Sequence, residues 1–178
     1  MDLTQDSLLT RALSGVLRSA QEGDLPLFAW TLGLPQAELL DMVHRCFPEL
    51  GTLAPIHDTD YQHLLDALPA DFDELVAMLL AHRPDAPHAS ETRWLARAIA
   101  AACFGERHLW QDLGLFDRAD VGALLGRHFP ALAGKNVHDL KWKRFLFQEL
   151  SLRQGTAPRM PPGCHRCEQR QACVQGLS

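Results

Sequence analysis

The chain has 178 residues, enough for one globular domain with a small appendage and too few for two large domains. Apolar residues make up 47% of the sequence and charged residues 22%, which argues against extensive disorder and against a long coiled coil. A formal net charge of −5 argues against a protein that coats nucleic acid or an anionic membrane. No apolar stretch reaches a membrane-spanning length and no signal peptide is recognisable. We therefore expect a cytoplasmic protein.

The first half of the chain shows the apolar spacing of amphipathic helices. Leu9, Leu13 and Val16 recur at intervals of three or four residues, which predicts a helix near the N-terminus. A proline is placed to open a second helix over residues 35–45, and a third is predicted over residues 72–82. No segment shows the two-residue alternation of a strand, so the predicted class is mainly α.

The second half continues the same pattern after a proline-containing linker. Ser90 is predicted to cap a helix over residues 91–103, and Asp117 to cap one that ends at His128. A last long helix is predicted between Asn136 and Gly155. These helices predict a compact multi-helix domain over residues 1–155.

Two segments of this domain resemble each other. Leu-Gly-Leu at residues 32–34 leads to Phe-Pro at residues 47–48, and Leu-Gly-Leu at residues 113–115 leads to Phe-Pro at residues 129–130. A tryptophan precedes each copy. We interpret the repeat as a possible duplication of a helical hairpin, with chance convergence of helix-ending residues as the alternative.

The composition changes abruptly after Gly155. Residues 156–178 form an irregular segment rich in proline and cysteine, with few large apolar side chains to hold it together. Cys164, Cys167 and Cys173 lie within ten residues of each other, a spacing that proteins use for zinc and for iron–sulfur clusters. We therefore predict a metal-binding tail in a reducing compartment, the alternative being a terminus with idle thiols.

Charge is also unevenly distributed. Residues 1–140 contain 10 Lys and Arg against 20 Asp and Glu, whereas residues 141–178 contain 7 against 2. Guanidinium groups near the three cysteines would lower the pKa of their thiols and stabilise an anionic metal site. The basic end of the chain thus coincides with the predicted metal site.

Several motifs together resemble the NifQ family. They are His-Leu-Trp-Gln-Asp-Leu-Gly-Leu at residues 108–115, Arg118, His-Phe-Pro-Ala-Leu at residues 128–132, Asn136, Lys-Trp-Lys-Arg-Phe at residues 141–145, Gln148 and the Cys-x2-Cys-x5-Cys tail. The resemblance covers most of the chain and is densest over residues 94–173. It implies a part in nitrogenase iron–molybdenum cofactor biosynthesis, in which these proteins are thought to carry molybdenum in an iron–sulfur cluster.

Two positions depart from the family pattern. The family tail usually begins with a further cysteine, where this chain has Arg159, and Ser151 stands where members often carry another. A guanidinium cannot replace a thiolate, because it stays protonated and has no lone pair to donate. The cluster then has an open corner, or takes a ligand from the body such as Cys103 or His108, or has been abandoned. We expect Arg159→Cys to supply a fourth thiolate and to tighten retention of the cluster.

The remaining candidate residues lie outside the tail, and for most of them two roles are open. Cys103 lies on the apolar face of its predicted helix, where packing is the plainer role, and Cys46 is expected to be buried packing. His108 is either a ligand or a structural hydrogen-bonding group. Lys141, Lys143 and Arg144 form either a solvated helix face or a basic surface for molybdate or an acidic partner.

The resemblance leads to a specific expectation of function. We expect a carrier rather than an enzyme, with a 3Fe–4S or 4Fe–4S type cluster and molybdenum held by Cys164, Cys167 and Cys173. Its expected partners are a molybdate or other molybdenum source and the cofactor-assembly scaffold proteins, with no nucleic acid and no membrane. The alternative is a zinc-stabilised interaction module without a cluster.

Overall fold

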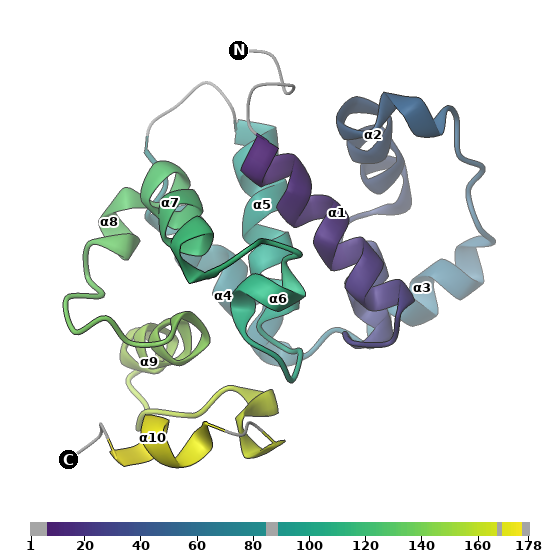
Figure 1. The fold of residues 1–178 in the computed structure, drawn as a ribbon. Helices are drawn as coiled ribbons and strands as arrows, with labels where there is room; N and C mark the ends of the chain where they lie inside the picture. Colours follow the sequence, from purple (N-terminus) through teal and green to yellow (C-terminus); the bar gives the residue numbers. More distant parts are fainter. Residues whose placement is uncertain (1–6, 85–88, 167–168, 176–178) are drawn as a thin grey trace.

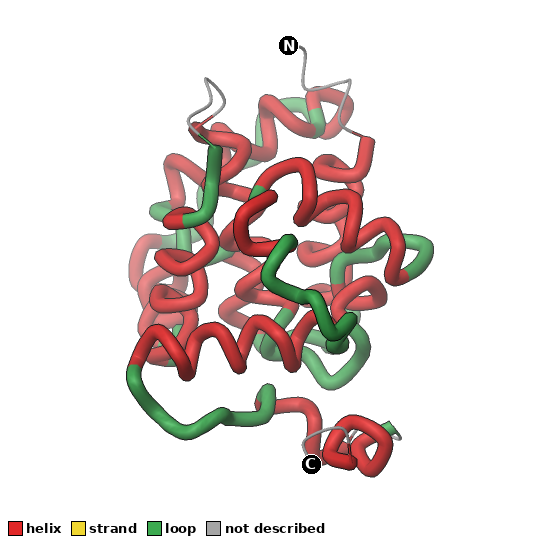
Figure 2. Tube along the Cα trace, turned by 90° about the vertical axis from the view of Figure 1, so that its left-hand side faces the viewer, coloured by secondary structure: helices red, strands yellow, loops and turns green. Residues whose placement is uncertain are grey.

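The structure is a computed structural model, and it describes residues 7–84, 89–166 and 169–175. Every regular element in these ranges is a helix, as Figure 2 shows, so the prediction of a mainly α fold is confirmed. The α-helices are α1 Ser7–Gln21, α2 Gln36–Cys46, α3 Asp58–Asp66, α4 Ala70–Ala81, α5 Ala89–Ala102, α6 Leu109–Asp112, α7 Arg118–His128, α8 Pro130–Ala133, α9 Trp142–Gln154 and α10 Arg170–Gln175. The 3-10 helices in the same described ranges are η2 Leu27–Thr31, η3 Pro48–Leu50 and η4 Pro162–Arg166.

Helix α5 forms the centre of the bundle. It packs against α1, α4 and α6 and is surrounded by them in Figure 1. Five of its alanines are fully buried, and these small side chains let neighbouring helices approach from several sides. They are Ala96, Ala98, Ala100, Ala101 and Ala102.

Helix α1 is fixed against the turn between α6 and α7 by a contact between glycines. A Cβ on Gly15 would lie 2.1 Å from the Leu113 carbonyl oxygen, and one on Gly114 would lie 2.8 Å from Gly15 Cα. Gly114 also has φ +62°, a conformation that side chains rarely adopt. This contact holds the segment before α7 close to the core.

The two similar segments adopt the same local structure. Phe47 and Phe129 have nearly identical backbone angles, with φ near −135° and ψ near 60°, and each is followed by a proline that opens a short helix. Each donates its N–H to the carbonyl four residues earlier, at 2.8 and 2.7 Å. Gly33 and Gly114 share φ +62°. The repeated sequence motif therefore forms the same helix C-terminus in both segments.

Some predicted helix boundaries agree with the structure and others do not. The Asp117 side chain accepts a hydrogen bond from Asp120 N, and Gly155 ends α9 with φ +67°, as predicted. Ser90, however, lies inside α5, which begins one residue earlier. Asn136 does not open α9, because its side-chain amide is hydrogen-bonded to the backbone of Leu140 within the preceding loop.

The segment after Gly155 lies against one end of the body, beneath α9 in both views (Figures 1 and 2). Its described part includes η4 and α10, so it is less irregular than the composition indicates. None of the described helices has the length and hydropathy that crossing a bilayer requires.

Candidate functional site

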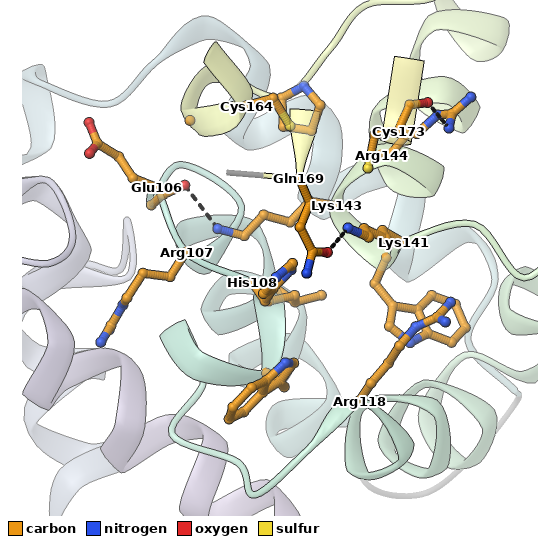
Figure 3. A pocket seen from close by; sticks show the side chains of 16 residues that line it. Glu106, Arg107, His108, Arg118, Lys141, Lys143, Arg144, Cys164, Gln169 and Cys173 are labelled. Atoms are coloured by element: carbon orange, nitrogen blue, oxygen red, sulfur yellow. Dashed lines mark hydrogen bonds between the residues drawn. The ribbon is translucent and has the colours of Figure 1, made fainter. Parts of the chain in front are cut away.

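A cavity of about 240 Å³ lies between the body and the cysteine tail. Its walls come from the loop that leads into α6 with the start of α6 itself, the first residue of α7, the start of α9, and the tail (Figure 3). Its charged and thiol-bearing lining residues are Glu106, Arg107, His108, Arg118, Lys141, Lys143, Arg144, Cys164 and Cys173. The cavity thus gathers residues that are up to about 70 positions apart in the sequence.

Two of the three predicted tail ligands line this cavity. Cys164 belongs to η4 and is half-buried, whereas Cys173 belongs to α10 and is buried. Cys167 lies outside the described residues. Within the described ranges, no three His, Cys, Asp or Glu side chains are grouped closely enough to hold a metal ion. The three-thiolate site therefore stays a prediction.

The tail is seated on the body by a close backbone contact. A Cβ on Gly163 would lie 2.4 Å from the Gly105 carbonyl oxygen and 2.7 Å from Glu106 Cα. Nearby, Arg166 forms an ion pair of 2.9 Å with Glu106. Because Cys164 follows Gly163 directly, this contact fixes where that thiol enters the cavity.

The first turn of α9 holds the other side of the tail. Lys141 donates a hydrogen bond to the side-chain oxygen of Gln169, and Arg144 donates one to the Cys173 carbonyl oxygen (Figure 3). The N-terminal end of α9 therefore both lines the cavity and holds the tail on the body through hydrogen bonds.

A buried ion network supports the floor of the site. Asp112 is fully buried and accepts hydrogen bonds from Lys143 Nζ at 2.6 Å and from Arg107 Nε at 2.9 Å. Lys143 also donates to the Gly105 carbonyl at 2.9 Å. Removing one partner from such a network leaves a buried charge uncompensated, which is costly. The network therefore fixes the loop on which Gly163 rests.

The structure contradicts one interpretation of the basic cluster for two of its three residues. Lys143 and Arg144 are each only 8% exposed, because they point between α9, the loop before α6 and the tail. The interpretation of a solvated helix face is wrong for both residues. They form part of the cavity wall.

The two body residues considered as replacement ligands are in different environments. His108 lines the cavity, and burial, followed by the charges of Lys141 and Lys143, lowers the pKa of its imidazole. Cys103 is fully buried, and burial raises the pKa of its thiol to about 12. Cys103 is not among the residues that line the cavity. The geometry therefore favours His108 over Cys103 as a group that can reach a ligand there.

Cys46 is part of the apolar core, as predicted from its position in the chain. Burial raises the pKa of its thiol to about 11. Cys46 is also not among the residues that line the cavity. Its role is packing.

Arg159 and Ser151 lie next to each other, away from the cavity wall. The Arg159 backbone N–H donates to Ser151 Oγ at 3.2 Å. Its guanidinium pairs with Asp71 of α4 at 2.9 Å and donates to Gln154. Neither Arg159 nor Ser151 lines the cavity, so a thiolate at position 159 has no direct path to it in this conformation.

Sequence reasoning missed several residues of the site. Asp112, Arg107, Gly163 and Gln169 were not singled out, although each supports or lines the cavity. A signal was available for Asp112, because it is the one carboxylate within residues 107–116, a run rich in apolar side chains. The roles of the other three depend on contacts that only the folded chain makes.

Comparison with known proteins identifies relatives of this chain. The NifQ family model matches residues 12–175. "Protein NifQ" of Azotobacter vinelandii is 34% identical over 170 residues, covering 90% of this chain and 85% of the relative. "Protein NifQ homolog" of Sinorhizobium fredii is 35% identical over 143 residues, covering 79% of this chain and 59% of the relative. "Protein NifQ" of Klebsiella pneumoniae is 39% identical over 82 residues, covering 46% and 49%.

No solved structure matches the chain. The family match spans nearly all described residues, including the loop before α6, the first turn of α9 and the tail that together form the cavity. The chain therefore belongs to the NifQ family, which takes part in nitrogenase iron–molybdenum cofactor biosynthesis.

Proposed function

We propose that this protein is an iron–sulfur and molybdenum carrier that supplies molybdenum for assembly of the nitrogenase iron–molybdenum cofactor. One observation carries the proposal: Cys164 and Cys173 line the same cationic cavity. A carrier has to hold its cargo at an accessible site and release it. The proposed role is transfer to a cofactor-assembly scaffold protein, without substrate turnover.

The chemistry of the lining fits a thiolate-bound cluster. Thiolates are the ligands that iron–sulfur clusters use, and a cluster held by several thiolates carries net negative charge. Arg144 and Lys141 stand beside the tail and offset such charge. In this site, Cys164, Cys167 and Cys173 would hold the cluster, and His108 is placed to approach it from the body.

A bound iron–sulfur cluster would supply a sulfide-rich face able to accept molybdenum. The chain's own contribution is to position the thiols and keep the site attached to the body. The described tail is tied to the body by the Gly163 contact and by hydrogen bonds from Lys141 and Arg144. Such attachment allows the tail to separate from the body while the helical core stays folded.

The alternative is a zinc-stabilised interaction module. Zinc would order the tail through the same thiols and leave it as a docking surface. The two functions predict different metal contents, so a single preparation distinguishes them.

The experiment is anaerobic purification and reconstitution of the full chain with iron, sulfide and molybdate. We expect broad absorption near ~400 nm from thiolate-to-iron charge transfer, with iron and molybdenum found by elemental analysis. Cys164→Ala, Cys167→Ala and Cys173→Ala should each lose the cluster while helical content stays nearly unchanged. Cys46→Ala is the matched control, because it removes a thiol from the core and should retain the cluster.

Two outcomes would contradict the proposal. A colourless protein with stoichiometric zinc and no iron after reconstitution supports the interaction module instead. Loss of the cluster in Cys46→Ala as complete as in the tail variants means that the tail cysteines are not the specific ligands.

A further inference from the structure

We infer that the cavity contains a binding site for a tetrahedral oxodianion, formed by the first turn of α9 and separate from the cysteine thiols. Such ions include molybdate, tungstate, sulfate and phosphate. Naming molybdate as the physiological occupant depends on the proposed function. The existence of the anion site does not depend on the proposed function.

The charge of the lining selects the sign of the ligand. Among the residues that the structure describes, five lysines and arginines line the cavity, against one carboxylate, that of Glu106, which pairs with Arg166. The five are Arg107, Arg118, Lys141, Lys143 and Arg144. A cavity with this lining disfavours cations and attracts anions.

Three of these cations have carboxylate partners behind the cavity wall. Arg107 and Lys143 share Asp112, and Arg118 pairs with Asp139 at 2.7 Å. The remaining two, Lys141 and Arg144, have only neutral partners among the described residues, namely the Gln169 amide and the Cys173 carbonyl. In the protein without a cluster, these two charges are therefore the ones that a bound anion would compensate.

The position of Lys141 and Arg144 at the N-terminal end of α9 also favours a bound anion. The N-terminus of a helix carries partial positive charge and unsatisfied N–H groups, and it normally attracts acidic side chains. The first turn of α9 has no acidic residue and no side-chain cap, and it carries Lys141, Lys143 and Arg144 instead. Cations at this end are unfavourable, and an anion bound beside Lys141 and Arg144 would offset their charge.

The size of the cavity suits a compact inorganic anion. At about 240 Å³ it is smaller than the ~300–1,000 Å³ pockets that hold organic ligands of drug size. Leu109, Trp110 and Trp142 provide apolar wall, which strengthens electrostatic attraction inside. Cys164 and Cys173 line the same space, so an oxodianion held here would lie beside the proposed cluster site.

The test uses metal-free full-length protein in a buffer without phosphate or sulfate, at low ionic strength. Equilibrium dialysis with elemental analysis measures binding of molybdate, tungstate, sulfate and phosphate separately. We expect saturable binding of one ion per chain, weakened about 10-fold or more in Lys141→Gln, because a charge-assisted hydrogen bond is lost. Lys141→Arg should retain most of the affinity.

Lys135→Gln is the matched control. Lys135 is an exposed cation outside the cavity, paired with Glu149, and its replacement should leave binding unchanged. Anion binding by the metal-free protein, which holds no cluster, separates this site from the cluster site. Urea unfolding of each variant identifies any variant that fails to fold. If Lys141→Gln fails to fold, Lys141→Arg still tests the site.

The outcomes are distinct. No saturable binding, or equal losses in Lys141→Gln and Lys135→Gln, overturns the anion site. Binding of all four ions with equal affinity supports the site and overturns molybdate as its specific occupant. Anion binding without any cluster after reconstitution supports this inference and contradicts the proposed carrier function.

Discussion

Replacing Lys143 by methionine tests whether the buried ion network holds the site together. The change removes an ammonium group that is 8% exposed, with its bonds of 2.6 Å to Asp112 and 2.9 Å to the Gly105 carbonyl. Loss of one partner of a buried ion pair costs ~3–5 kcal/mol. Because Asp112 keeps its bond from Arg107, we expect a loss near the lower end, about 3 kcal/mol.

Urea unfolding followed by far-ultraviolet circular dichroism measures this loss, provided that the denaturant slope stays constant. The control is Lys135→Met, which removes a side chain that is 49% exposed and pairs with Glu149 at 3.4 Å. An exposed pair is worth less than ~1 kcal/mol, so the control should change little. Adding Asp112→Leu to Lys143→Met should restore part of the stability by removing the buried carboxylate. Equal losses in the two methionine variants would refute the reasoning.

Three further predictions concern the tail and the buried thiols. Gly163→Ala should weaken anion binding and cluster retention with little loss of helix, because its Cβ would lie 2.4 Å from a carbonyl oxygen; Gly126→Ala, with open space around it, should change neither. Above about pH 9, unfolded chains lose the Cys103 proton that the folded protein keeps to about pH 12. The free energy of unfolding should therefore fall with rising pH, by up to ~1.4 kcal/mol per pH unit from this group, and less steeply in Cys103→Ala. Arg159→Cys should leave the rate of cluster loss to a chelator unchanged, because Arg159 faces Asp71 outside the cavity; slower loss would show that position 159 reaches the cluster.

Local signals in the sequence were enough to predict the class and several helix ends. Asp117 caps α7 and Gly155 ends α9 because capping depends on the residue itself and its nearest neighbours. Cys164 and Cys173 could be chosen as candidates for a similar reason, since close spacing in the chain brings two thiols near each other whatever the rest of the fold does.

Helix α3 and the start of α9 were not predicted. The buried face of α3 rests on one residue, Tyr61, whose hydroxyl donates to the Leu34 carbonyl at 2.7 Å, so its sequence lacks a clear apolar period. The predicted start of α9 was too early, because the Asn136 side chain forms hydrogen bonds with the backbone N–H and carbonyl of Leu140 in the loop and does not cap a helix.

The sequence by itself determined that this chain is helical, that its basic residues gather near the C-terminus, and that its clustered thiols lie in the same region. Only the tertiary structure decided which cations face the cysteines. Lys143 and Arg144 read as ordinary surface residues of a helix until the loop before α6 and the tail close over them. Burial of a charge depends on what packs against it, and here the partners come from segments about 30 residues away on either side.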